Sequence, residues 1–190
     1  LQLLSAGKRA QPNQVRTLIL TPTRELAAQV GESVATYGKH MSLSSAVVFG
    51  GVKINPQMMK LRRGVDVLVA TPGRLMDLYS QNAVKFTYLE VLVLDEADRM
   101  LDMGFQEELD AIVDAAPAKR QTLMFSATFQ SGIQSVAKRI MHKPIVVSAP
   151  EVHDDSTIDQ HFYIADDADA RLTAVRLLLL QHRPDSAVIF

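Results

Sequence analysis

The stretch Val91-Leu92-Val93-Leu94-Asp95-Glu96-Ala97-Asp98 decides the fold class, because an apolar run leads directly into three acids. The apolar run predicts a buried strand, and strands buried on both faces are typical of parallel sheets covered by helices. In open α/β sheets, ligands bind beyond the carboxyl ends of the strands. The sequence therefore predicts that these carboxylates lie at a ligand-binding edge.

The rest of the chain alternates short apolar runs with helical patterns, which predicts βαβ units and a parallel sheet flanked by helices. Strands are expected at 17–20, 45–49, 65–70, 90–94, 121–126 and 144–148. Helices are expected at 24–39, 56–63, 73–80, 98–101, 106–115 and 132–141. The sequence thus predicts an α/β domain over residues 1–148.

A polar, acidic stretch at 149–157 predicts a linker. Beyond it we expect a strand at 160–164, a helix at 169–182 and a strand at 187–190, which would begin a second domain over residues 158–190. Both ends of the chain interrupt expected elements, so we expect a fragment of a longer protein.

Composition narrows the class of protein. Hydrophobic residues make up 47% of the 190 residues, which favours a packed core over disorder. The chain has no cysteine, which excludes disulfides and thiolate metal sites. The apolar run Leu177–Leu180 is too short to cross a bilayer, so we expect a cytoplasmic protein that does not bind membranes. Residues 1–100 carry 12 basic and 8 acidic side chains, so a polyanion should bind there.

The acids after the fourth strand suit phosphate chemistry. A Mg²⁺ ion needs few protein carboxylates because it keeps several waters, and Asp95 at the strand end could hold one of them. Glu96 is placed to polarise an attacking water. The alternative is a pair of solvated acids at the strand end, which could also cap the following helix.

Ser126 and Thr128 follow the fifth strand and could hydrogen-bond a neighbouring carboxylate such as Asp98. Such a contact would couple the nucleotide end of the sheet to other parts of the protein. The alternative is that the hydroxyls only cap the next helix, which is the commoner role of an isolated Ser-Ala-Thr.

Three strand-to-helix junctions carry small residues beside a base. Helix starts present unpaired N–H groups and a positive dipole end, which suit phosphate. Arginine can clamp phosphate oxygens, although each junction alone is also explained by turns and caps. The candidate residues are Thr23, Arg24, Gly50, Gly51, Thr71, Pro72, Gly73 and Arg74.

Together these motifs resemble the first RecA-like domain of DEAD-box RNA helicases. The segment 22–27 (Pro-Thr-Arg-Glu-Leu-Ala) resembles motif Ia, Gly50-Gly51 the GG motif and 71–74 motif Ib. Asp95-Glu96-Ala97-Asp98 resembles motif II and Ser126-Ala127-Thr128 motif III. The stretches 47–59 and 91–105 resemble the bacterial RhlE subgroup. The resemblance implies a partial first RecA-like domain followed by the start of a second.

The resemblance also implies roles for single residues. Asp95 would bind Mg²⁺ through water, and Glu96 would activate the hydrolytic water of ATP. Asp98 with Ser126 and Thr128 would link the nucleotide state to strand separation. The residues of the three junctions would hold the RNA backbone independently of sequence. Ribosome assembly and RNA decay are the pathways that the resemblance suggests.

One family element is missing from the sequence. A phosphate-binding P-loop requires Gly-x-x-x-x-Gly-Lys-Ser/Thr, and neither Gly7-Lys8 nor Gly38-Lys39 satisfies this pattern. We therefore expect this chain alone neither to hydrolyse ATP at a useful rate nor to unwind RNA. A non-catalytic RNA-binding or scaffold module stays open as an alternative, whereas the combined motifs disfavour another P-loop ATPase acting on DNA or protein.

Overall fold

The computed structural model describes residues 1–5, 7, 9–128, 131–149, 159 and 161–189. The chain divides into two compact units, Leu1–Ile145 and Val146–Phe190. Most of the linker expected at 149–157 lies outside the described residues. In the described part of the chain, no helix has both the length and the apolarity needed to cross a membrane.

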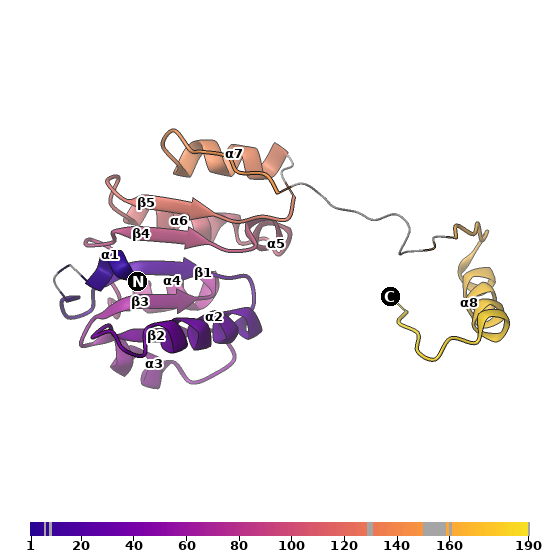
Figure 1. The fold of residues 1–190 in the computed structure, drawn as a ribbon, viewed down its shortest axis with the longest axis horizontal. Helices are drawn as coiled ribbons and strands as arrows, with labels where there is room; N and C mark the ends of the chain where they lie inside the picture. The colour runs from indigo at the N-terminus through magenta and orange to yellow at the C-terminus, as the bar shows by residue number, and fades with distance from the viewer. Residues whose placement is uncertain (6, 8, 129–130, 150–158, 160, 190) are drawn as a thin grey trace. The chain divides into compact units, whose positions relative to one another are not determined.

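A parallel five-stranded sheet in the order β2-β3-β1-β4-β5 forms the first unit (Figure 1). The strands are β1 (Val15–Leu20), β2 (Ser45–Val48), β3 (Val65–Ala70), β4 (Val91–Leu94) and β5 (Gln121–Met124). All six residues of β3 are buried, as expected of an inner strand covered on both faces. This architecture confirms the predicted α/β class.

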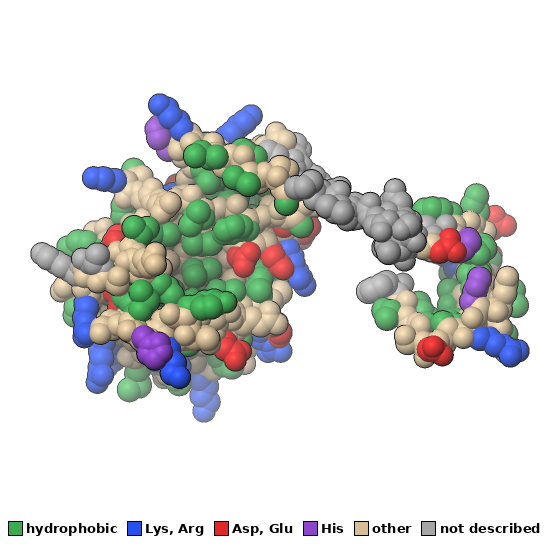
Figure 2. All heavy atoms as spheres, viewed as in Figure 1, with side chains coloured by type: hydrophobic (Ala, Val, Ile, Leu, Met, Phe, Trp, Pro, Cys, Tyr) green, Lys and Arg blue, Asp and Glu red, His purple; other side chains and the backbone are tan. Residues whose placement is uncertain are grey.

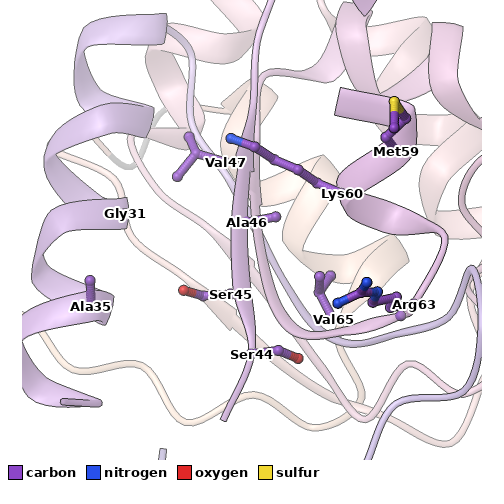
Figure 3. A pocket seen from close by; sticks show the side chains of 11 residues that line it. Gly31, Ala35, Ser44, Ser45, Ala46, Val47, Met59, Lys60, Arg63 and Val65 are labelled. Carbon is purple, nitrogen blue, oxygen red and sulfur yellow. The ribbon is translucent and has the colours of Figure 1, made fainter. Parts of the chain in front are cut away.

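Helices cover both faces of this sheet. They are α1 (Gln2–Ser5), α2 (Arg24–Tyr37), α3 (Ile54–Leu61), α4 (Pro72–Ser80), α5 (Ala97–Asp102), α6 (Gln106–Ala115) and α7 (Ser131–Ile140), and the second unit contains α8 (Ala168–His182). Helices α2 and α3 lie on opposite sides of β2 (Figure 3). The helix at residues 2–5 agrees with the helical pattern expected at the start of the chain, and β1 begins two residues earlier than the sequence pattern predicts.

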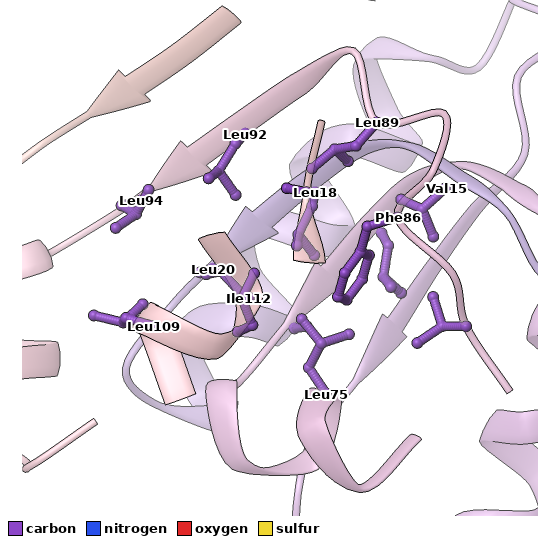
Figure 4. Packing of buried hydrophobic residues seen from close by; sticks show 14 of the residues in the cluster. Val15, Leu18, Leu20, Leu75, Phe86, Leu89, Leu92, Leu94, Leu109 and Ile112 are labelled. Atoms are coloured by element: carbon purple, nitrogen blue, oxygen red, sulfur yellow. The ribbon is translucent and has the colours of Figure 1, made fainter. Parts of the chain in front are cut away.

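The main core lies between the sheet and helices α4 and α6 (Figure 4). Leu18 and Leu20 of β1 are fully buried there beside Leu92 and Leu94 of β4. Each such side chain contributes about 1.5–3 kcal/mol through removal of its apolar surface from water. The same residues hold β4 in place, so the core fixes the position of the acids that follow it.

The buried Arg16 connects several segments at the amino-terminal end of the sheet. Arg16 is 3% exposed, and its guanidinium lies 3.2 Å from an Asp66 carboxylate oxygen and 2.7 Å from one of Glu90. Asp66 also accepts hydrogen bonds from the backbone N–H and hydroxyl of Ser44 at 2.9 and 3.0 Å. This network connects β1, β3 and the segments that precede β2 and β4.

Three expected strands are absent. Residues 144–148, 161–164 and 187–189 form no strand, and Gln160 and Phe190 lie outside the described residues. Ile145 and Ile164 are 89% and 99% exposed. A strand needs a neighbouring strand to pair its backbone groups, and none of the described segments supplies one here.

Candidate functional site

The carboxyl ends of the strands meet at one edge of the sheet, where the predicted site residues begin. The residue after each strand still pairs with its neighbour: Thr21 N–H donates to the Ala70 carbonyl at 3.0 Å, and Asp95 N–H to the Leu20 carbonyl at 2.9 Å. Phe125 N–H likewise donates to the Leu94 carbonyl at 2.8 Å. The loops after β1, β3, β4 and β5 therefore leave the sheet at one common edge.

Asp95 is a half-buried carboxylate directly after β4. Burial raises its pKa, and the neighbouring charge of Glu96 raises it further, although the Glu96 N–H donates to Asp95 Oδ1 at 3.1 Å. Both unfavourable effects would be relieved by a nearby cation. Figure 2 shows acidic side chains gathered at the edge toward which the strands point.

Glu96 adopts a left-handed backbone conformation, with φ 49° and ψ 53°. This conformation costs a residue other than glycine about 1–2 kcal/mol, and such strain clusters at functional sites. The Glu96 side chain makes no capping bond to α5, and its Oε2 lies 3.4 Å from Nη1 of Arg99. Glu96 thus occupies the N-cap position of α5 without capping the helix through its side chain, and its carboxylate lies at the surface, as in the alternative of solvated acids at the strand end.

Asp98 accepts two hydrogen bonds from the loop after β5. The backbone N–H and hydroxyl of Thr128 donate to Asp98 Oδ2 at 2.9 and 3.1 Å. Burial raises the pKa of Asp98, but the hydrogen bonds from the N–H groups of Thr128 and Arg99 outweigh it, and the net pKa is lowered. Ser126 stabilises the same loop, because its hydroxyl donates to the Thr128 carbonyl at 2.7 Å. The predicted contact between Asp98 and this loop is present.

The junction after β1 starts α2. Thr23 is the N-cap, and its hydroxyl accepts a hydrogen bond from the Leu26 N–H at 3.2 Å. Arg24 is exposed and pairs with the adjacent Glu25 at 2.7 Å. A Cβ on Gly51 would lie 3.3 Å from Nη1 of Arg24, so the arginine lies against the loop after β2.

The two glycines of that loop differ in what they require. Gly51 has φ +79° and therefore needs the conformational freedom of glycine. Gly50 would place a Cβ in open space, and so would Gly73 at the start of α4. The fold does not require glycine at positions 50 and 73, so their backbone is left open to solvent and to any ligand.

Arg74 faces the protein rather than the solvent. Its side chain is 10% exposed, and Nη2 donates to the Val52 carbonyl at 2.9 Å. Its Nε and Nη1 atoms are buried, and neither has a hydrogen-bond partner among the described residues. Arg74 therefore tethers the loop after β2 to α4, where Thr71 is the N-cap and Pro72 the first residue of the helix.

Sequence reasoning missed residues that hold this loop. Gln57 of α3 is 6% exposed, and its side-chain amide donates to the Phe49 carbonyl at 3.1 Å. The Val52 carbonyl is the acceptor for Arg74. Nothing in the sequence pattern distinguishes Gln57 from a surface residue, because its role depends on a turn of the chain eight residues away.

The edge thus carries two groups of residues. Asp95, Glu96 and Asp98 with its Thr128 partner follow β4 and β5, while the hydroxyls, glycines and arginines follow β1, β2 and β3. Among the described residues, no cluster of three or more His, Cys, Asp or Glu side chains could enclose a metal ion. An ion held mainly by waters and phosphates, as Mg²⁺ is, fits the Asp95 carboxylate nevertheless.

Comparison with known proteins shows the family. The family model for the DEAD/DEAH box helicase matches residues 1–136, which include all of the candidate site residues. The chain therefore belongs to the DEAD/DEAH box helicase family. Its five-stranded parallel sheet flanked by helices is consistent with the RecA-like domain of that family.

Similar proteins come from plants, bacteria and an amoeba. The chain is 37% identical to DEAD-box ATP-dependent RNA helicase 14 of Arabidopsis thaliana, over 91% of the chain and 28% of that protein. It is 36% identical to ATP-dependent RNA helicase CshA of Listeria monocytogenes, over 94% and 34%. For ATP-dependent RNA helicase ddx46 of Dictyostelium discoideum the identity is 43%, over 77% and 13%. The chain spans about a third or less of these relatives.

Proposed function

We propose that this chain is part of an ATP-dependent RNA helicase, whose ATP site lies beyond β4 and β5 and whose RNA surface lies beyond β1, β2 and β3. The observation that carries the proposal is the contact of Thr128 with Asp98, which joins the loops after β4 and β5 although the two residues are 30 positions apart. Relatives named as ATP-dependent RNA helicases support the assignment.

In this proposal Asp95 and Glu96 have different roles at the nucleotide. Bound ATP supplies the phosphoanhydride bond, and its Mg²⁺ neutralises charge on the phosphates. Asp95 would hold a water of the metal, and a cation there would offset the burial and the Glu96 charge that raise the pKa of Asp95. Glu96, held on its left-handed turn, would orient the attacking water and accept its proton.

The Asp98–Thr128 contact would report the nucleotide state to the RNA surface. Asp98 lies two residues beyond Glu96, and Thr128 lies in the loop after β5. A shift of α5 on nucleotide binding would move both partners together, because Ala97 N–H donates to the Phe125 carbonyl at 2.9 Å. Ser126 would keep the loop in its conformation through its bond to the Thr128 carbonyl.

On the RNA side, backbone N–H groups and hydroxyls would contact phosphates without reading bases. Thr23 and Arg24 would act at the start of α2, and Thr71, Pro72 and Gly73 at the start of α4. Arg74 would act through the loop that contains Gly50 and Gly51, because it donates to Val52. Three loops at one sheet edge fit a continuous sugar-phosphate backbone.

Gly73→Ala tests the RNA surface without disturbing the fold. A Cβ at this position meets nothing within 4 Å, and alanine stabilises a helix by about 0.5–1 kcal/mol relative to glycine. We expect the melting temperature to hold or rise, while affinity for single-stranded RNA in the complete helicase falls roughly tenfold, or about 1.4 kcal/mol. Fluorescence anisotropy with a labelled oligoribonucleotide measures this.

Gly132→Ala on α7 is the matched control. A Cβ at this position would lie 4.0 Å from Leu101 Cδ1 of α5, which is an ordinary van der Waals distance. We expect unchanged RNA affinity there. Equal affinity of the Gly73→Ala variant and the parent would remove the start of α4 from the proposed RNA surface.

A non-catalytic RNA-binding or scaffold module is the second candidate, and a parent protein without a P-loop would favour it. It predicts RNA binding by the parent protein that ATP does not change. The helicase proposal predicts RNA affinity that rises with ATP analogues, so one titration separates the two candidates.

The finer assignments belong to the same proposal. Likeness of residues 47–59 and 91–105 to the bacterial RhlE subgroup supports a bacterial, cytoplasmic protein, while the relatives include both bacterial and plant proteins. The acidic segment after residue 148 would then join two RecA-like domains. Ribosome assembly and RNA decay are the proposed pathways.

A further inference from the structure

The outer edge of β2 forms a groove that the helicase proposal does not use. The groove encloses about 710 Å³ and runs between α2 and α3 at the amino-terminal end of the sheet, away from the Gly50–Gly51 loop. Its floor is the backbone of residues 44–47, and its walls include Gly31 and Ala35 of α2 and Met59 and Lys60 of α3 (Figure 3). We call this the β2 groove.

The backbone of β2 presents unused hydrogen-bonding groups to this groove. Val67 N–H donates to the Ser44 carbonyl at 3.0 Å, and Thr71 N–H to the Val48 carbonyl at 3.1 Å. In a parallel ladder, alternate residues bond the same neighbour, so the even-numbered residues of β2 face β3. Ser45 and Val47 therefore direct their N–H and carbonyl groups outward, where none of the described residues forms a further strand.

The two walls of the groove differ in chemistry. On the α2 side, Gly31 and Ala35 are small, and Ser45 and Val47 point toward them (Figure 3). On the α3 side lie Lys60 and Arg63 with the 65% exposed Met59. Basic side chains project around α3 in Figure 2. Among the described residues, no carboxylate lies within ion-pair distance of Lys60 or Arg63.

The positive charge continues along the edge. A neighbouring cavity of about 280 Å³ shares Ala35 and Ser45 with the β2 groove and adds Lys39 to its lining. No acid is among the lining residues of either cavity. The groove therefore combines outward backbone groups with uncompensated cations, which favours an extended, acidic ligand.

We propose that the β2 groove binds an extended acidic peptide of a partner protein, which adds to β2 as a parallel or antiparallel edge strand. Main-chain hydrogen bonds to Ser45 and Val47 would supply affinity, as in other cases of strand addition. Side chains of a strand alternate between its faces. Acids would therefore face Lys60 and Arg63, and apolar residues would face Gly31 and Ala35.

The spacing supports acids at every second position of the peptide. Residues two apart in a strand point to the same face and lie about 6–7 Å from each other. Lys60 lies in the last turn of α3 and Arg63 in the turn that follows the helix, and both line the groove. Two acids separated by one apolar residue would therefore both face the side of the groove that carries these cations.

A blocked synthetic peptide of alternating aspartate and valine, with a fluorescent label, tests the proposal on the 190-residue chain. We expect saturable binding by anisotropy, and none for the peptide with lysine in place of aspartate. Lys60→Glu with Arg63→Glu should weaken binding roughly tenfold or more. Lys119→Glu with Lys138→Glu, an equal change of charge on exposed residues elsewhere, should leave it unchanged, with circular dichroism confirming that both variants are folded.

Two further experiments distinguish strand addition from binding by electrostatic attraction alone. A peptide N-methylated at alternate residues keeps its acids but loses the donors, so we expect it not to bind. On binding of the unmodified peptide, amide exchange should slow at Ser45 and Val47 but not at Ala46 and Val48. Equal binding of the methylated peptide would refute strand addition.

Other outcomes overturn the proposal. Absence of binding, with aggregation of the Lys60→Glu, Arg63→Glu variant, would show that these cations only protect an exposed edge. Displacement of the peptide by polyuridylate, lost in the same variant, would assign the groove to nucleic acid. Self-association of the chain that the peptide competes away would assign it to a second copy.

Discussion

At the scale of single residues, Glu96 has a backbone conformation that its sequence does not predict. The acid was expected beyond β4, but its left-handed φ of 49° was not, because glutamate has no preference for that region. The turn is imposed by the bond from Ala97 N–H to the Phe125 carbonyl on the next strand. The strain at Glu96 is thus maintained by tertiary contacts.

Glu96→Gln in the complete helicase tests the proposed role of this carboxylate. The amide matches the acid in size but accepts no proton, so we expect ATP hydrolysis to fall about 10²–10⁴-fold. Binding of ATP and RNA should stay close to that of the parent, measured by fluorescence titration beside phosphate release. Glu107→Gln on α6 is the control. A parallel loss of folding and RNA affinity would instead mean that Glu96 is structural.

At the scale of elements, Arg74 links two loops. It follows Pro72 and Gly73 at the start of α4, and its guanidinium donates to the loop after β2. Sequence reasoning placed Arg74 against a phosphate, because an arginine near a helix start suits one. The structure buries its Nε and Nη1 atoms, so a phosphate would reach them only after the loop moves.

For Arg74→Ala in the complete helicase we expect weaker RNA binding with an unchanged dependence on salt. The Val52 carbonyl loses its donor and the loop loses its tether, but no phosphate contact is removed. A direct contact to single-stranded RNA would instead reduce the slope of log affinity against log salt by about 0.7. Titrations at several salt concentrations, with Arg62→Ala as an exposed control, distinguish the two roles.

Asp66→Asn tests the buried network that joins β1 and β3. Burial raises the pKa of Asp66, but hydrogen bonds from Ser44 and Arg16 outweigh it, so its pKa lies below the usual value. A carboxyl with a lowered folded pKa stabilises the fold above its unfolded pKa of about 3.9, and this stabilisation is lost as pH falls through the folded value.

We therefore expect Asp66→Asn to lower the free energy of unfolding at pH 7 by about 1–3 kcal/mol, because Arg16 loses its buried partner and keeps only the half-exposed Glu90. The difference from the parent should shrink toward low pH. Urea unfolding at neutral and acid pH measures it, with Asp114→Asn on the exposed side of α6 as control. A constant difference across this range would contradict the assigned pKa direction.

At the scale of the whole molecule, the two units differ in how their elements are held. The first unit buries residues from each of its strands except β5, whose Leu123 is 37% exposed. Helix α8 of the second unit has no buried residue among those described. Its apolar Leu172, Leu177 and Leu180 are exposed, as expected of a helix without the strands that the sequence pattern predicts beside it.

The 190-residue chain is expected to hydrolyse ATP far more slowly than the complete helicase, even with RNA present. Asp95 and Glu96 are in place, but the sequence has no Gly-x-x-x-x-Gly-Lys-Ser/Thr segment to hold the phosphates. A phosphate-release assay that compares the two proteins at equal concentration tests this. Turnover by the chain at the rate of the complete helicase would refute the expectation.

The sequence by itself determined the alternation of strands and helices and the placement of acids, hydroxyls and glycines after particular strands. These features depend on residues that are neighbours along the chain, whose periodicity and propensity act locally. Only the tertiary structure decided the strand order β2-β3-β1-β4-β5, the pairing of Asp98 with Thr128, the burial of Arg74 and the open edge of β2. The strand order and the two side-chain contacts join segments that are 20 or more residues apart in the sequence, and the open edge is a strand without a neighbour. All of them depend on which surfaces of the chain are buried together in the core.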